Sequence, residues 1–217
     1  NFSGPLADNY IISLRANNNS VFSVAANGDV HALGNYYGAS AIFGTSTNPG
    51  DLAERVDIAA DDAVEAGDVV MVDGSAPDTY RRSSSAYEES VAGVISTNPT
   101  IVVGNGRTDY TAVMAMVGRV PVKVSAENGA IARGDLLVAA SMPGYAMKYD
   151  AATDTNNKMV GVIGVALESL PASSTGKILA LIRTGWVYNR DKDIDSIQGD
   201  IERLATAQGI NLNADEE

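Results

Sequence analysis

Few residues in this 217-residue chain have the type and spacing that catalysis or metal binding requires. His31 is the only histidine and the chain has no cysteine, which excludes disulfides, thiolate catalysis and cysteine metal sites. A catalytic triad or a histidine metal site would have to use His31, whose acidic neighbour is Asp29. The segment 104–106 (GNG) lacks the further Gly and the Lys-Ser/Thr of a phosphate loop. We interpret His31 as a surface strand residue and predict no catalytic residue, no cofactor and no metal site.

Two segments hold carboxylates close enough together to suggest chemistry. Carboxylates are dense between positions 57 and 68, but their spacing does not follow the D-x-[DN]-x-[DN]-G pattern of a calcium loop, so a solvated loop is favoured. Asp51 and Glu54, followed by Arg55, have a spacing that would place two carboxylates on one face of a helix or beside a turn. We favour a short capping or ion-pair element there. The dense carboxylates are Asp57, Asp61, Asp62, Glu65 and Asp68.

The segment 133–135 (RGD) has the composition of an adhesion motif. The RGD segment directly precedes the apolar run 136–140. In the same way, the segment 65–68 (EAGD) directly precedes the apolar run 69–72. The shared Gly-Asp pair therefore predicts a turn that launches a strand, and we discount adhesion.

The elements that carry these residues are predicted to be short strands. Val, Ile, Ala and Leu dominate the apolar residues, and 21 Gly with Asn-Gly and Pro-Gly pairs interrupt them. Three pairs of segments recur in the same order at offsets of about 65 to 68 residues, which indicates an internal duplication. The fold class predicted is mainly β, a duplicated barrel-like or sandwich-like domain in which two halves bury a shared core. The pairs are EAGDVVMV with ARGDLLVA, VAGVIS with VGVIGVAL, and AVMAMVGRVPV with KILALIRTGWV.

We predict three regions, 1–50, 51–189 and 190–217. The first alternates apolar and polar residues around Asn-rich and Asn-Gly turns, which predicts short β-hairpins and a linker. Such strands bury little surface alone and need a partner. The last contains an apolar stripe at spacings of 3, 4 and 3, which predicts a helix of about four turns with a narrow seam. The stripe either docks on its own domain or packs against copies of itself. The predicted subunit-interface residues are Ile11, Leu14, Phe22 and Val24 in the first region and Ile194, Ile197, Ile201 and Leu204 in the last.

The net charge of −12 argues against partners that carry negative charge. Phosphate backbones and anionic membranes repel such a chain, so we predict no nucleic-acid binding. No apolar run approaches the roughly 18 residues of a membrane helix, so no membrane insertion is expected. The chain begins at Asn1 rather than Met, as expected of a processed or truncated chain.

The order DLAERV, EAGDVVMV, VAGVISTNPTIVVG, GRVPVKV, GDLLVAASMPGYAMK, VGVIGVALE and GKILALI resembles a β-rich domain near the C-termini of bacterial surface and phage fibre proteins. The segment VAGVISTNPTIVVG in particular is similar to the self-cleaving intramolecular-chaperone domains of phage pre-neck appendages and tail spikes. The upstream VFSVAANGDVHALGNYYG resembles linkers that build trimeric β stalks. The resemblance covers roughly 51–182. The chain departs from one version of the cleavage machinery, since it has no Ser-Asp…Leu-Lys dyad motif.

The resemblance implies a structural subunit of an extracellular fibre or filament, on a cell surface or a virion, that assembles as a homo-oligomer such as a trimer. The alternative it implies is an intramolecular chaperone domain that promotes trimerisation and cleaves itself near the start of the main domain. A third hypothesis is a fibre tip that binds a surface glycan or host receptor through tyrosines such as Tyr36 and Tyr37. The chain's main partner is in each case expected to be itself.

Overall fold

The structure is a computed structural model that describes residues 10–17, 19–26, 28–33, 50–96, 98–104, 111–154, 159–188 and 190–208. The chain divides into two compact units, Asn1–Ile42 and Phe43–Glu217. The predicted three-region division of 1–50, 51–189 and 190–217 stays a prediction.

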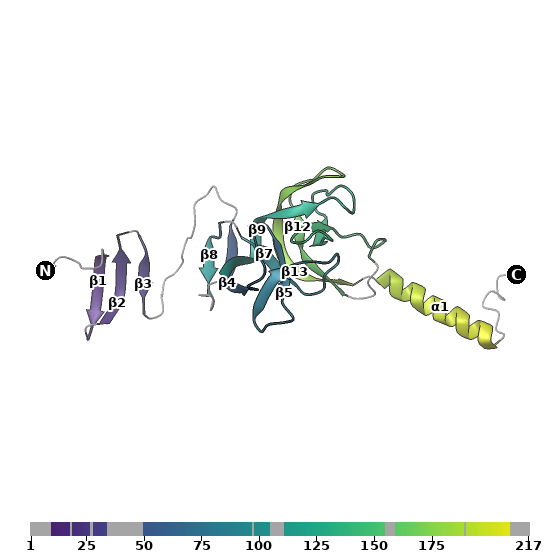
Figure 1. Ribbon diagram of the computed structural model, residues 1–217, viewed down its shortest axis with the longest axis horizontal. Helices are drawn as coiled ribbons and strands as arrows, with labels where there is room; N and C mark the ends of the chain where they lie inside the picture. The colour runs from purple at the N-terminus through teal and green to yellow at the C-terminus, as the bar shows by residue number, and fades with distance from the viewer. Residues whose placement is uncertain are drawn as a thin grey trace. The chain divides into compact units, whose positions relative to one another are not determined.

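The first unit is a three-stranded antiparallel sheet in the order β1-β2-β3 (Figure 1). Its strands are β1 (Tyr10–Ala16), β2 (Asn19–Ala25) and β3 (Val30–Ala32). Asn17, at φ 50°, turns β1 into β2, and Gly28, at φ 94°, lies in the turn before β3. Asn and Gly tolerate positive φ, so the Asn-rich and Asn-Gly segments fold as the predicted hairpins.

The second unit is one ten-stranded sheet, followed by a helix. The strand order is β11-β10-β12-β13-β9-β7-β5-β6-β4-β8, with β9 also pairing with β4 and β11. The predicted mainly β fold class is confirmed. The elements are β4 (Asp51–Ile58), β5 (Val69–Val72), β6 (Thr79–Arg82), β7 (Val91–Ile95), β8 (Ile101–Val103), β9 (Thr111–Ser125), β10 (Leu136–Ala139), β11 (Ala146–Lys148), β12 (Met159–Ala166), β13 (Thr175–Tyr188) and α1 (Arg190–Gln208).

The pairings close the sheet into two rings that share β9. One ring runs β4-β6-β5-β7-β9 and returns to β4, and the other runs β9-β13-β12-β10-β11 and returns to β9. Figure 1 shows β9 and β13 lying together in this body. β9 is 15 residues long because its first half pairs with β4 and its second half with β13. The predicted duplication is therefore present as two barrel-like halves that share a strand.

The two halves match in their parallel bridges. In the first half Asp57 of β4 pairs with Thr79 of β6. In the second half Val124 of β9 pairs with Ala146 of β11, so each partner lies 67 residues further along the chain. β9 thus ends the first half and also takes the place of β4 in the second.

The turns before β5 and β10 are built in the same way. The carboxylate of Asp68 accepts the N–H of Glu65 at 2.7 Å, and the carboxylate of Asp135 accepts the N–H of Ala132 at 2.8 Å. In both turns the backbone N–H of the Asp donates a hydrogen bond to the carbonyl of that same residue, Glu65 or Ala132. The Arg-Gly-Asp segment is therefore turn structure, as predicted.

Both turns also depend on a glycine. Gly67 and Gly134 have φ values of 91° and 94°, in the left-handed region that favours glycine. Their N–H groups donate to the carbonyls of Ile95 in β7 and Ala166 in β12. These two carbonyls lie 71 residues apart in the chain, more than the offset of about 68 expected from sequence, because the second half carries extra residues before β12.

Three clusters of buried side chains fill the second unit. The largest draws Val69 and Val94 from the first half and Leu137, Ile163 and Ile178 from the second, so it joins the halves. A second cluster lies among β4, β5, β7 and β9, and a third gathers around Tyr87, β10, β11 and β12. The expected shared core is present.

Candidate functional site

The first candidate surface is one face of the N-terminal sheet. Leu14 pairs with Phe22, which pairs with Ala32 on the next strand. Paired residues share a face of the sheet, so Leu14, Phe22 and Ala32 form a row of side chains across the three strands. The paired residues Ile12, Val24 and Val30 form a second row beside it, and the two rows place six apolar side chains together. Leu14 is 53% exposed, and Phe22 and Val24 are half-buried.

Three of the four residues predicted there are thus brought together, while the side chain of Ile11 lies outside the described residues. Their role as a subunit interface stays a prediction. His31 lies on β3 with an exposed side chain and pairs with Ser23, as expected of a surface strand residue.

The second candidate surface is a stripe on α1. Ile197, Ile201 and Leu204 are 59%, 47% and 64% exposed. They recur at spacings of four and three residues, which places them on one side of the helix. The side chain of Ile194, the first member of the predicted stripe, lies outside the described residues.

The helix is longer than expected from the sequence. It has 19 residues and begins at Arg190, whereas about four turns were predicted. It ends at Gln208.

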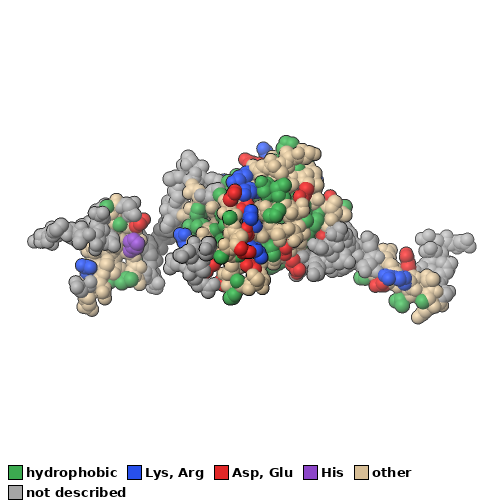
Figure 2. Space-filling model, in the orientation of Figure 1, with side chains coloured by type: hydrophobic (Ala, Val, Ile, Leu, Met, Phe, Trp, Pro, Cys, Tyr) green, Lys and Arg blue, Asp and Glu red, His purple; other side chains and the backbone are tan. Residues whose placement is uncertain are grey.

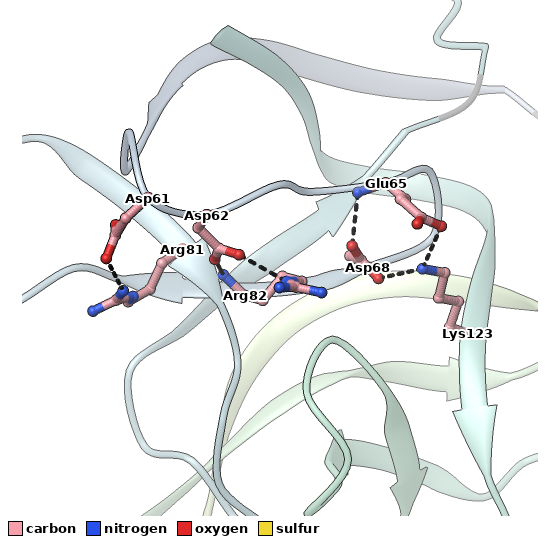
Figure 3. A network of polar contacts seen from close by, with 7 residues as sticks. All are labelled: Asp61, Asp62, Glu65, Asp68, Arg81, Arg82 and Lys123. Carbon is pink, nitrogen blue, oxygen red and sulfur yellow. Dashed lines mark hydrogen bonds and ion pairs between the residues drawn. The ribbon is translucent and has the colours of Figure 1, made fainter. Parts of the chain in front are cut away.

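The acidic segment 57–68 forms part of a charged network (Figure 3). The carboxylate of Asp62 accepts the backbone N–H of Arg82 at 2.6 Å and its Nε–H at 2.8 Å. Asp61 pairs with Arg81 at 3.4 Å. These bonds attach the loop after β4 to β6. The expectation of a solvated loop is therefore wrong for Asp62, whose side chain is only 9% exposed.

Lys123 of β9 anchors the other end of this loop. Its Nζ lies 2.7 Å from Asp68 and 3.0 Å from Glu65, and Asp68 is buried at 1% exposure (Figure 3). Burial disfavours the charged amine, but the hydrogen bonds and charges of Asp68 and Glu65 outweigh it and raise the pKa of Lys123. The hydrogen bond from Lys123 in turn lowers the pKa of Glu65.

The network is suited to holding the fold rather than to binding a cation. Asp61, Asp62, Glu65 and Asp68 each already face Arg or Lys. Figure 2 shows Lys and Arg side chains interleaved with Asp and Glu side chains on the visible face of the second unit. Among the described residues, no three His, Cys, Asp or Glu side chains are grouped so as to hold a metal ion.

The start of β4 contains a polar arrangement that the sequence did not reveal. Asp51 is buried and its carboxylate accepts the hydroxyl of Ser96 at 2.7 Å. The carbonyl of Gly50 accepts the N–H of Arg119 at 3.0 Å. Gly118, at φ 122°, makes this approach possible, because a Cβ there would lie 2.5 Å from the Gly50 oxygen and from Asp51 Cα.

Asp51 and Glu54 do not form the helical or turn-flanking pair considered from their spacing. They lie on β4, a strand, so the expected capping or ion-pair element is wrong. Ser96 is 45 residues from Asp51, and nothing in the sequence around either residue indicates their contact. Trp186, a second residue that pattern analysis missed, is 66% exposed on β13.

Tyr36 and Tyr37, the tyrosines named for glycan binding, lie outside the described residues. Within the part of the chain that is described, no helix combines the length and apolar character needed to cross a membrane.

No protein-family model matches the chain, and no curated protein matches it. Among solved structures, the chain is similar to the pre-mature gene product 12 of bacteriophage phi29, at 15% identity and a TM-score of 0.49. The match covers 76% of this chain and 24% of that one, so the chain spans about a quarter of the length of the protein it matches. At this level of likeness, function has to be argued from the residues of the chain itself.

Proposed function

We propose that the chain is a structural subunit of an extracellular fibre or filament, borne on a cell surface or a phage appendage, that assembles with copies of itself. The N-terminal sheet and α1 supply the contacts between copies. The observation that carries the proposal is the exposed apolar stripe of Ile197, Ile201 and Leu204 on α1.

The chemistry of the stripe favours self-association over solvent exposure. Fully burying an Ile or Leu side chain is worth roughly 1.5–3 kcal/mol, and the stripe holds three that are largely open to water. The spacing is that of a heptad seam, with Ile201 at one core position and Ile197 and Leu204 at the other, a composition compatible with two strands or with three. An acidic helix is compatible with this, because Arg203 pairs with Asp200 at 2.6 Å beside the seam.

The N-terminal sheet supports the same proposal. Its apolar face is open to water, and covering such a face with a second apolar surface gains the free energy of burying it. Copies of the sheet packed on one another would bury the rows that contain Leu14 and Val24. The sequence resemblance of this region to trimeric β stalks points the same way, so a trimer is the assembly that fits both surfaces.

The test compares the mass of the full chain with that of a seam variant by light scattering after gel filtration. Ile201→Asp with Leu204→Asp should lower the mass, because buried carboxylates disfavour the seam. Glu202→Ala, which changes an exposed residue of the same helix, should leave the mass unchanged. An unaltered oligomer in the double Asp variant would remove α1 from the proposal.

A second candidate function is self-cleavage at the start of β4, as in an intramolecular chaperone. The buried Asp51 carboxylate and the Ser96 hydroxyl lie beside the Gly50–Asp51 peptide bond, whose carbonyl is held by the N–H of Arg119. Hydrolysis would add water across this bond, with the oxygen going to the Gly50 carbonyl carbon and a proton to the Asp51 nitrogen. A carboxylate paired with a hydroxyl can accept and return that proton.

Mass spectrometry of the full chain after prolonged incubation tests this candidate. Cleavage predicts fragments 1–50 and 51–217, with Asp51→Asn and Ser96→Ala remaining intact. Ser85→Ala, which changes an exposed serine, should cleave like the unaltered chain. A single unchanged mass for the unaltered chain would rule the candidate out.

A further inference from the structure

The amine of Lys123 lies between two carboxylates that differ in their exposure to solvent (Figure 3). Its Nζ is 2.7 Å from Oδ1 of Asp68 and 3.0 Å from Oε2 of Glu65. The side chains of Asp68 and Lys123 are 1% and 13% exposed, whereas that of Glu65 is 75% exposed. The amine and the Asp68 carboxyl are therefore in contact inside the fold, and Glu65 lies at the side that is open to solvent.

The backbone holds the second oxygen of the Asp68 carboxyl. Oδ2 accepts the N–H of Glu65 at 2.7 Å, so the two oxygens of the group have different partners. A hydrogen-bond donor in this position would also stabilise the negative oxygen that forms when a nucleophile adds to the carboxyl carbon. The Asp68 carboxyl thus has a nitrogen nucleophile beside one oxygen and an oxyanion donor at the other.

An ion pair is a costly way to fill this site. Removing two charges from water can cost more than their attraction returns, and a neutral replacement of similar size is often as stable or more stable. Among the described residues, Asp135 of the matching turn has no ion pair, and that turn folds all the same. A reaction that removes both charges from the buried pair is therefore favourable for the fold.

We propose that Lys123 and Asp68 condense to an amide, a covalent link between the turn before β5 and the shared strand β9. The bond from Nζ to Cγ of Asp68 forms, and the bond from Cγ to Oδ1 breaks. Of the three hydrogens of the ammonium group, one stays on the amide nitrogen and two leave with Oδ1 as one water molecule. Glu65 accepts a proton from the amine and returns it to the departing oxygen.

The condensation is slow, because the amine has to lose a proton before it can attack. Although burial opposes it, the hydrogen bonds and charges of Asp68 and Glu65 raise the pKa of Lys123, so the neutral amine is rare. The contact between the two groups acts in the other direction, since groups held together react as if at a very high concentration. A freshly purified chain therefore holds the ion pair of Figure 3, which converts to the amide with time.

The link goes beyond the proposed assembly and lies on different residues. It joins two residues that are 55 positions apart, so it restricts the unfolded chain in the way that a disulfide does. In a chain without cysteine, an amide is a crosslink that reducing conditions do not break. A fibre subunit that is pulled along its length would keep this turn attached to β9.

Mass spectrometry of the denatured full chain, sampled over a prolonged incubation, tests the proposal. We expect the chain to lose the mass of one water molecule. After trypsin, the segment 56–81 should be joined to the segment 120–133, in which Lys123 is no longer cleaved. Lys123→Arg keeps a positive charge beside Asp68 and should retain the full mass. Lys177→Arg, which changes the other lysine in contact with this turn, is the control and should condense like the unaltered chain.

Glu65→Gln tests the route of the proton, because it leaves Lys123 beside Asp68. It should slow the condensation about a hundredfold or more, as expected for the loss of a general acid and base. A full mass with separate segments after incubation would overturn the proposal, and so would a loss of water that persists in Lys123→Arg. A Glu65→Gln variant that condenses as fast as the unaltered chain would remove Glu65 from the step.

Discussion

Lys123 is the residue that ties the first half's turn to the shared strand. Its amine contacts both carboxylates of the segment 65–68, and the ring of Tyr145 lies 5.8 Å from its Nζ. The matching turn before β10 has a half-exposed Asp135 in place of the buried Asp68. Only the turn before β5 therefore has an ion pair with Lys123, and the buried carboxylate of Asp68 depends on that ion pair.

Lys123→Met should destabilise the chain by about 3–5 kcal/mol, because it leaves the Asp68 carboxylate buried without its cation. Lys177→Met is the matched control, since Lys177 contacts the same turn through one exposed hydrogen bond to the Ala66 carbonyl. Urea unfolding followed by circular dichroism measures both. Equal losses in the two variants would contradict the anchoring role.

Acid should lower the free energy of unfolding through the same network of charged side chains. The hydrogen bond from Lys123 lowers the pKa of Glu65 below its usual 4.5, and hydrogen bonds from Ser75 lower that of Asp73 below 3.8. A carboxyl with a lowered folded-state pKa stabilises the fold above its unfolded pKa and loses this contribution as pH falls through the folded value. The free energy of unfolding should therefore decline below about pH 4.5, with a shallower decline in Lys123→Met. An identical pH profile in that variant would contradict the coupling.

At the scale of elements, the two halves share a close approach between strands at a glycine, Gly93 on β7 and Gly164 on β12. A Cβ at Gly93 of β7 would lie 2.6 Å from the carbonyl oxygen of Ala115 on β9. A Cβ at Gly164 of β12 would meet the carbonyl oxygen of Leu181 on β13 in the same way. Equivalent strands thus approach one another closely at equivalent places.

Gly93→Ala and Gly164→Ala should each destabilise the chain by about 1–3 kcal/mol, because the added methyl must push backbone apart. Gly74→Ala, where nothing lies within 4 Å of the added carbon and φ is not in the left-handed region, should change little. Thermal unfolding compares the three. A neutral Gly164→Ala would mean that β12 and β13 do not pair as described.

The sequence predicts the repeat because its markers are local. Gly-Asp before an apolar run specifies a turn and then a strand, and it does so twice. The sequence does not predict that β9 serves both halves, because the strand's second role depends on pairing with β11 and β13, which are contributed from far along the chain. β4 was missed because its charged residues, among them Glu54 and Arg55, hide the alternation of a strand.

The candidate surfaces also differ in whether the sequence predicts them. The α1 stripe follows from helical spacing alone, and the apolar rows of the N-terminal sheet follow from period-two alternation. The Asp51–Ser96 contact depends on residues brought together across the fold, and a lone Ser carries no spacing signal.

At the scale of the whole molecule, the chain presents a net charge of −12 together with two exposed apolar surfaces. Like charges resist unspecific association, while apolar seams drive a specific one. Self-assembly into a defined oligomer is consistent with both the high net charge and the exposed apolar surfaces, and a fibre subunit needs both properties.

Sedimentation equilibrium of the full chain at several concentrations tests this most directly. The proposed assembly predicts a mass near three times the 22.5 kDa of one chain, retained on dilution into the low micromolar range. A single-chain mass at every concentration would contradict it.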